Sequence, residues 1–348
     1  MSEPGRGGLA HIILYCLSLA YGLAVSVRLR LYGLGILSTK RLPCKVISIG
    51  NITAGGSGKT PMAIHVAGLL KKRGERVTVL SRGYGRASSG VLTVSDGKNI
   101  LLGPREAGDE PYLMATRLKG VPVVVGEDRA EAGLFAIRKF NPACIILDDG
   151  FQHLRLERDL NILLVDAQAG FGNGFLLPRG ILREPLSAVK RASITMVKGS
   201  GLGDNTADII HRSGKSVVKF NYKPNCLTHL SGNQTLPLTS LKGKRVIAIA
   251  GIANPESFFS TLRRLNAEIV KTIIFPDHHA YSKADILKIE ALKKAAPDAD
   301  IIITTEKDGV KLKGLVDRRL GIYALSIDVW IEDRMEFEKA FSFLKEDR

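Results

Sequence analysis

The stretch SIGNITAGGSGKTP, residues 48–61, decides the fold class that this chain is expected to adopt. It ends in Gly58-Lys59-Thr60, as a phosphate-binding loop does, although Thr53 stands where the Walker consensus has its first glycine. Glycines let backbone N–H groups approach phosphate oxygens, Lys59 would contact the β- and γ-phosphates, and the Thr60 hydroxyl would bind Mg²⁺. The expected nucleotide-binding residues are Thr53, Ala54, Gly55, Gly56, Ser57, Gly58, Lys59 and Thr60.

The segments on either side of this loop predict a strand, a helix and a second strand. CKVISIG (44–50) is rich in β-formers, apolar residues recur at helical spacing from Ala63 to Leu70, and RVTVLSRGYG (76–85) begins another strand. Further strand-like runs lie within 121–126, 143–150, 160–167, 192–199, 215–222, 245–259, 268–279 and 299–312. We expect an α/β protein: a P-loop NTPase-like domain with a mostly parallel sheet (41–200) and a smaller second α/β domain (207–348), separated by the linker GSGLGDNT (199–206).

The N-terminus predicts a membrane-associated helix with a basic flank, within residues 1–40. Residues 9–27 have His11 as their only side chain that charges near neutral pH, and this length is close to a bilayer span. Several basic residues follow and only Arg6 precedes. A spanning helix would leave the rest of the chain in the cytoplasm, and a helix lying flat would favour anionic headgroups. Both arrangements stay open, with a buried core helix as the alternative.

The composition limits the class of ligand. The chain of 348 residues has a formal net charge of +16, which attracts nucleic acid, a phosphorylated substrate or an acidic membrane surface. A nucleic-acid-binding ATPase is disfavoured because the basic residues are not interleaved with aromatic ones. The four cysteines form no C-x-x-C pair and no zinc pattern, which favours reduced, structural thiols.

A metal-binding acid is expected at the end of a strand near the phosphate loop. CIILDDG (144–150) places Asp148 and Asp149 after an apolar run, as in a Walker B strand. Two adjacent carboxylates repel one another unless they share a cation, which favours Mg²⁺. A turn or helix cap is the alternative for one of the two.

Three weaker motifs have structural alternatives. Asp109 and Glu110 of GDEPYLMA (108–115) suit a helix N-cap. The paired histidines of PDHHAYSKAD (276–285) precede a capping box from Ser282 to Asp285, and TTEKD (304–308) suits another from Thr305 to Asp308. TTEKD lacks the Asn-Lys-x-Asp pattern of guanine recognition.

A basic cluster follows the expected Walker B strand. The long Gly- and Pro-rich segment at 170–185 is of a length that is usually functional or disordered. Its basic residues and those just beyond it, Arg179, Arg183, Lys190 and Arg191, indicate recognition of an anionic acceptor, with a solvated face as the alternative.

Together these motifs resemble one family, the tetraacyldisaccharide 4'-kinases (lipid A 4'-kinases) of Gram-negative bacteria. The resemblance covers nearly the whole chain and includes GNITAGGSGKTP, LSRGYG, GDEPYLMA, ILDDGFQHLRLERDLNILLVDA, GFLLPRGILREPLSAVKRA, FPDHH and TTEKD, in this order. An altered first glycine is a habit of the family, so Thr53 is compatible with the site.

The resemblance implies a kinase that transfers the γ-phosphate of ATP, with Mg²⁺, to the 4'-hydroxyl of tetraacyldisaccharide 1-phosphate, giving lipid IVA. It also implies that the enzyme acts at the anionic cytoplasmic face of the inner membrane, and that it binds no nucleic acid and needs no obligate protein partner. A membrane-associated P-loop regulatory NTPase, a GTPase-like switch acting on a protein partner, is the alternative.

By motif, the family's roles transfer to particular residues. Asp109 would be the catalytic base, assisted by His278 rather than His279, with Lys59 on the phosphates. Asp149 and Glu184, with Thr60 and Asp148, would hold Mg²⁺; Gln152 and Arg183 would line the site, with Arg179 also among the acceptor-binding residues. We further expect closure of the two domains to bring His278 of the second against Asp109 of the first.

Overall fold

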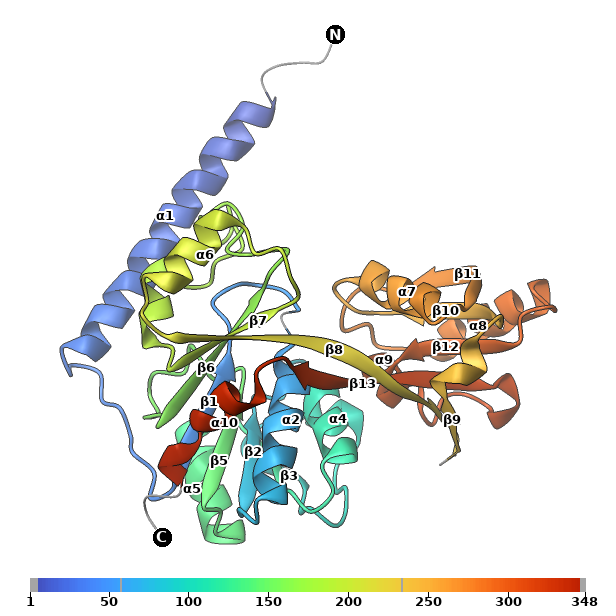
Figure 1. Ribbon diagram of the computed structural model, residues 1–348, viewed down its shortest axis with the longest axis horizontal. Coiled ribbons are helices and arrows are strands. Elements are labelled where there is room, and N and C mark those ends of the chain that lie inside the picture. The colour runs from blue at the N-terminus through green and yellow to red at the C-terminus, as the bar shows by residue number, and fades with distance from the viewer. Residues whose placement is uncertain (1–5, 57, 233, 345–348) are drawn as a thin grey trace. The chain divides into compact units, whose positions relative to one another are not determined.

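The structure is a computed structural model that describes residues 6–56, 58–232 and 234–344, with side chains from residue 10 onward (Figure 1). Contacts divide the chain into two compact units. The first takes the described parts of 1–82, 126–221 and 330–348, and the second takes those of 83–125 and 222–329. The strands β8 (Ser216–His229) and β13 (Ile322–Ile331) each contribute residues to both units.

A parallel sheet forms the centre of the first unit. Its strands lie in the order β2 (Val77–Ser81), β5 (Cys144–Asp148), β1 (Lys45–Gly50), β6 (Leu160–Asp166), β7 (Ile194–Lys198) and β8. β1 therefore lies between β5 and β6, and the register pairs Ile49 with Asp148. Ligands of open α/β sheets bind at the carboxyl ends of the strands, so this register places the phosphate loop beside the two aspartates.

Helices cover this sheet as the hydrophobic spacing predicts. α2 (Lys59–Lys72) buries Ala63, Val66, Ala67 and Leu70, the apolar stripe seen in the sequence. α5 (Arg129–Phe140) begins after Asp128, whose carboxylate accepts from the first-turn N–H groups. Apart from the N-terminal helix, the other helices of this unit are α6 (Asp204–His211), the 3₁₀ helices η1 (Leu186–Arg191) and η4 (Ser342–Leu344), and α10 (Arg334–Lys339).

The strands of the second unit have a hydrophobic core on each face. β10 (Arg245–Ala250) lies between β11 (Glu268–Ile274) and β12 (Ile301–Thr305), and all three are parallel. Alternate residues of β10 join different cores: Ile247 packs with residues of α8 (Lys283–Ala295) and Ala248 with residues of α7 (Pro255–Arg264). Successive side chains of a strand point to opposite faces, so two covered faces require the continuous apolar run seen in RVIAIA.

Shorter elements complete the second unit. β3 (Leu92–Ser95) and β4 (Val123–Val125) are antiparallel, β9 (Thr235–Pro237) pairs antiparallel with β8, and β13 is parallel to β12. The helices are α3 (Pro104–Ala107), α4 (Asp109–Arg117), α9 (Glu306–Leu312), η2 (Leu238–Leu241) and η3 (Arg318–Leu320). α4 packs against α9, which brings two segments together that lie about two hundred residues apart in the chain.

α1 (Arg6–Gly33) is a long N-terminal helix, drawn in blue in Figure 1. Its part from Ala10 to Gly33 is long and apolar enough to cross a membrane, and only 6% of its apolar window is buried, so the alternative of a buried core helix is wrong. Side chains hold it to the first unit: Ser18 Oγ donates to the Leu176 carbonyl at 2.8 Å, and Tyr21 Oη to the Arg183 carbonyl at 2.9 Å.

The expected alternation of strands and helices is confirmed, and the strands are mostly parallel. The division into compact units differs from the expected domain boundaries. Residues 83–125 belong to the second unit and 330–344 to the first. The chain therefore passes between the two units several times, instead of dividing once near residue 200. Compactness and independent folding are different properties, so the boundaries at 41–200 and 207–348 stay a prediction.

Candidate active site

The phosphate loop runs from the end of β1 into the first turn of α2. Gly55 has φ 108° and Gly58 has φ 83°, a backbone region that side chains with a Cβ rarely adopt. Gly58 is also the N-cap residue of α2, and as a glycine it has no side chain that could cap the first-turn N–H groups. The N-terminus of α2 is therefore built to accept an anion. Ser57 lies outside the described residues.

The position of Thr53 has a local explanation. Thr53 forms an isolated antiparallel bridge with Leu182, and the Ala54 N–H donates to the Ile181 carbonyl at 2.6 Å. The Asn51 amide also donates to the Thr53 hydroxyl at 3.2 Å. The first half of the loop is thus extended and strand-like, a conformation that suits a β-branched residue and does not require glycine.

Lys59 lies among polar partners rather than in the hydrophobic core. Its Nζ is 3.4 Å from Asn51 Oδ1 and 3.7 Å from Asp149 Oδ1, and its side chain is 15% exposed. The ammonium group is therefore held close to the loop that would receive the phosphates.

The two aspartates after β5 differ in environment. Asp148 is buried, with Oδ2 3.4 Å from Ser81 Oγ. Asp149 has φ 49° and accepts two hydrogen bonds from Arg183, at 3.1 and 2.7 Å. Burial by itself would raise the pKa of Asp149, but the hydrogen bonds from Arg183 and the charge of Lys59 lower it below its ordinary value. Asp149 is therefore ionised at neutral pH.

The predicted residues Gln152, Arg183 and Glu184 form one network with the loop. Gln152 Nε2 donates to the Asn51 carbonyl at 2.7 Å, and lies 3.4 Å from Glu184 Oε2. Arg183 also donates to Asn51 Oδ1 at 2.7 Å. Glu184 is 1% exposed; Arg191 donates to its Oε2, while its Oε1 is buried and has no hydrogen-bond partner among the described residues.

The predicted Mg²⁺ residues suit a nucleotide-bound cation. Among the described residues no group of three or more His, Cys, Asp or Glu could hold a metal by itself. Mg²⁺ usually takes one or two protein carboxylates and fills its other positions with water and phosphate oxygens. The buried Oε1 of Glu184 and the hydroxyl of the buried Thr60 are oxygen donors of this kind, so the residues present fit such an ion.

Arg179 lies against α1. Its guanidinium is 3.8 Å from the ring centroid of Phe175 and 4.6 Å from that of Tyr15. The two rings pack edge to face, with centroids 6.1 Å apart. These stacking contacts stabilise the docking of α1. They are contacts of a different kind from the acceptor binding predicted for Arg179.

Asp109 and His278 are in contact within the second unit. Asp109 Oδ2 is 3.4 Å from His278 Nδ1 and 3.4 Å from Lys311 Nζ. Burial by itself would raise the pKa of Asp109, but the hydrogen bond with His278 and the charge of Lys311 lower it. His278 has φ 58°, a strained conformation of a kind that clusters at functional sites. Lys307 Nζ lies 3.0 Å from His278 Nε2.

The structure brings Asp109 and His278 together, as expected, but within one compact unit; the closure of two domains stays a prediction. Both residues belong to the same compact unit, because α4 carries Asp109 and packs against α9. His279 has different partners: its Nε2 lies 3.1 Å from Asp285 Oδ2, and its ring stacks on Phe275.

Of the helix caps given as alternatives for the three weaker motifs, one is wrong and two are found in the structure. The cap reading of GDEPYLMA is wrong, because Gly108 is the N-cap residue of α4 and the Asp109 carboxylate faces His278 and Lys311. The capping box from Ser282 to Asp285 is confirmed, and Thr305 caps α9 by accepting from the Asp308 N–H.

Four residues at or near these sites were missed by the sequence reasoning. Lys307 and Lys311 lie one turn apart on α9, a spacing that could have drawn attention to both. Asn51 follows β1 directly. Arg129 is 4% exposed, and burial lowers its pKa to about 10 although the nearby Asp148 opposes this. Nothing in the sequence distinguishes Arg129 from an exposed helix residue.

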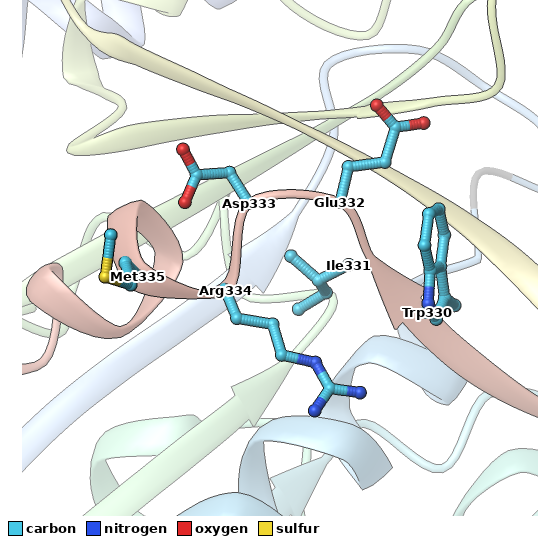
Figure 2. Close-up of a pocket in the computed structure, with 6 residues that line it drawn as sticks. All are labelled: Trp330, Ile331, Glu332, Asp333, Arg334 and Met335. Atoms are coloured by element: carbon cyan, nitrogen blue, oxygen red, sulfur yellow. The ribbon is translucent and has the colours of Figure 1, made fainter.

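A hollow of about 610 Å³ lies elsewhere in the first unit, where β13 passes into α10. Figure 2 shows its wall, the six consecutive residues Trp330, Ile331, Glu332, Asp333, Arg334 and Met335. None of the predicted site residues lines it, so its size does not make it the reaction site.

Comparison with known proteins gives one consistent result. A family model described as tetraacyldisaccharide-1-P 4'-kinase matches residues 10–344. Proteins named tetraacyldisaccharide 4'-kinase are similar: that of Desulfatibacillum aliphaticivorans is 44% identical over 97% of this chain and 93% of its own length. That of Geobacter metallireducens is 45% identical over 95% of this chain and 97% of its own length. The crystal structure of LpxK from Aquifex aeolicus in complex with ATP is 36% identical, covers 96% of this chain and 99% of its own, and superposes with a TM-score of 0.79.

Proposed function

This chain belongs to the tetraacyldisaccharide-1-P 4'-kinase family, and from this premise we propose how its residues divide the work of phosphoryl transfer. The chain is an ATP-dependent kinase that transfers the γ-phosphate to the 4'-hydroxyl of tetraacyldisaccharide 1-phosphate, giving lipid IVA. The match along residues 10–344, which includes an intact Gly58-Lys59-Thr60, is the observation that carries this conclusion. It supports a kinase over a GTPase-like switch acting on a protein.

The phosphate loop would bind and neutralise the nucleotide. The N-terminus of α2 and the glycines Gly55 and Gly58 would receive the phosphates, and Lys59 would offset the negative charge that spreads over the transferred group. Asp148, Asp149, Glu184 and Thr60 would hold Mg²⁺, which when bound supplies further charge neutralisation. Arg183 and Gln152 would keep Asn51 and Asp149 in place through the contacts described above.

Asp109 would accept the proton of the 4'-hydroxyl. A sugar hydroxyl is a weak nucleophile near neutral pH, and a positioned base contributes about 10²–10⁴ in rate. The low pKa of Asp109 keeps it ionised, and its contact with His278 orients the carboxylate. Asp109 suits this role better than Asp149, because Asp149 would hold Mg²⁺, and the charge of the ion makes a bound carboxylate a poor proton acceptor.

Membership of a lipid A pathway family and the exposed apolar α1 indicate association with a membrane. We propose that α1 holds the chain at the cytoplasmic face of the inner membrane of a Gram-negative bacterium, where the basic residues after α1 contact anionic lipids. Deletion of residues 1–27 should release the protein from sedimented membranes, and unchanged sedimentation would contradict this anchoring role.

Transfer from labelled ATP tests the function directly. The purified full chain, held in neutral detergent, is incubated with γ-labelled ATP and tetraacyldisaccharide 1-phosphate, and the lipids are separated by thin-layer chromatography. Label should enter the glycolipid with the wild-type chain and not with Lys59→Met. Label found only as inorganic phosphate would contradict the kinase assignment and favour an NTPase.

A further inference from the structure

A second cavity of the first unit, of about 490 Å³, lies where the last turn of α1 meets the segment between β5 and β6 and the helix η1. This volume is within the range of small-molecule sites. Its wall combines apolar residues, among them Leu29, Tyr32 and Leu154, with two arginines, Arg158 and Arg191, and one acidic residue, Glu157. Of the residues predicted for nucleotide, metal or acceptor binding, only Arg191, from the basic cluster, lines it.

Arg158 carries a charge that its surroundings balance poorly. Its Nη1 donates to the His153 carbonyl at 2.9 Å, and no carboxylate oxygen among the described residues forms an ion pair with it. Burial, and then the charge of Arg191, lower the pKa of Arg158 to about 10, against the opposing charge of Glu184. A guanidinium in such a place is unfavourable unless an anion joins it.

Other polar atoms of the wall also lack partners. Arg191 donates through Nη2 to Glu184, and its guanidinium lies 4.9 Å from the ring centroid of Phe151. Its Nε is buried without a hydrogen-bond partner among the described residues, and the same holds for Asn161 Oδ1. Because these two atoms have almost no accessible surface, the polar groups that the cavity offers a ligand are the two guanidinium groups, which suit a phosphate group.

The edge of the cavity has the character of a membrane interface. Gly33 and Thr39 both line the cavity, so the loop between them lies at its edge. In that loop Leu34 is 74% exposed, Ile36 65% and Leu37 36%. Basic residues flank it on both sides, at positions 28, 30, 40 and 41. Exposed apolar residues beside basic ones are typical of segments that enter the headgroup region of anionic membranes.

We propose that this cavity binds the headgroup of one anionic phospholipid. Its phosphate lies between Arg158 and Arg191, and the acyl chains follow Leu29 and Tyr32 toward the apolar loop. Phosphatidylglycerol has the negative charge that this arrangement requires. The inference rests on the membrane association proposed above, but it does not depend on the kinase chemistry.

Direct lipid binding tests the proposal on the full chain in neutral maltoside detergent. Short-chain phosphatidylglycerol is titrated and the bound lipid is counted by native mass spectrometry, with short-chain phosphatidylcholine as the neutral comparison. One phosphatidylglycerol should bind per chain, and Arg158→Gln should weaken this binding about tenfold or more, because hydrogen bonds to charged groups are lost. Arg155→Gln is the matched control: it removes the same charge three residues away from a side chain that is exposed and pairs with Asp128.

A second variant guards against an effect on folding. Ser187 lines the cavity and is exposed, so Ser187→Trp should fill the space without removing a charge or disturbing the core. It should reduce phosphatidylglycerol binding as Arg158→Gln does. Equal affinities for both lipids, or equal losses in Arg158→Gln and Arg155→Gln, would overturn the proposal.

The acceptor also carries a phosphate, and kinetics separate it from a bilayer lipid. In phospholipid-free detergent micelles Arg158→Gln should leave the KM for the acceptor unchanged within about twofold. A KM that rises about tenfold there, with phosphatidylglycerol binding intact, would mean that the cavity receives the acceptor's own phosphate and would overturn the phospholipid assignment. Because lipid binding is measured without catalysis, an inactive kinase would leave this result interpretable.

Discussion

Removing Asp109 and His278 one at a time and then together should show that the histidine acts through the aspartate. The variants are Asp109→Asn, His278→Ala and the double variant. Asp109→Asn keeps the size of the side chain but removes the proton acceptor, so it should lower kcat about 10²–10⁴-fold. The remaining question is how large the effect of His278 should be.

The structure sets the size of the His278 effect. The Asp109–His278 contact is 3.4 Å long, and Lys311 holds the same carboxylate oxygen at 3.4 Å. Hydrogen bonds to charged groups contribute about 1.5–3 kcal/mol, and a contact longer than the usual 2.7–2.9 Å or so belongs at the lower end. About 1.5 kcal/mol corresponds to roughly a tenfold loss of rate. With Asn at position 109 the charged partner is absent, so His278→Ala should then cost about twofold or less.

Initial rates of label transfer at saturating ATP provide the measurement, with ATP binding followed separately to confirm that each variant keeps its nucleotide site. His279→Ala is the matched control. Its ring contacts Asp285 and Phe275 rather than Asp109, so transfer should stay within about threefold of the wild type. If the single losses multiply in the double variant, His278 acts independently of Asp109. A fully active Asp109→Asn enzyme would refute the assignment of the base.

Three other substitutions have distinct expected outcomes. Lys59→Met should abolish transfer with an unchanged circular dichroism spectrum, because the ammonium contacts polar groups rather than the core. Lys311→Met should shift the acidic limb of the kcat/KM profile to higher pH: Lys311 lowers the pKa of Asp109, so its loss raises that pKa and the base protonates earlier as pH falls. An unmoved limb would exclude this role. Gly50→Ala should lower the free energy of unfolding by about 1–3 kcal/mol, and with it the melting temperature, because the new Cβ would lie 2.6 Å from Phe151 Cβ. An unchanged melting temperature would contradict this crowding.

The parts of the site that are contiguous in the sequence could be predicted from it. The loop at 53–60, its strand and its helix follow from glycines, lysine and periodic apolar residues within one short segment. The bridge from Thr53 to Leu182 could not be predicted, because its partner lies far along the chain and no local pattern connects the two. The structure thereby explains why a residue other than glycine is accommodated at position 53.

Charge patterns were less informative than local motifs. Arg179 belongs to the basic cluster that predicted acceptor binding, yet its guanidinium stacks on Phe175 and Tyr15. Arg129, by contrast, is buried near the aspartates and was not singled out. Whether an arginine packs, pairs or binds a ligand depends on neighbours that only the fold supplies.

Asp308 shows why the structural and the functional interpretation of a motif need not exclude each other. Its N–H donates to the Thr305 hydroxyl that caps α9, as the sequence alternative for TTEKD required. Its buried carboxylate accepts from the Gly251 N–H at 2.8 Å and lies 3.3 Å from Lys311 Nζ, which in turn contacts Asp109. The residues that fix the start of α9 therefore also fix the ammonium group that keeps Asp109 ionised. A sequence motif can identify the cap, because the two residues that form it are three positions apart. The link to Asp109 requires α4 to pack against α9, and this contact joins segments about two hundred residues apart in the sequence.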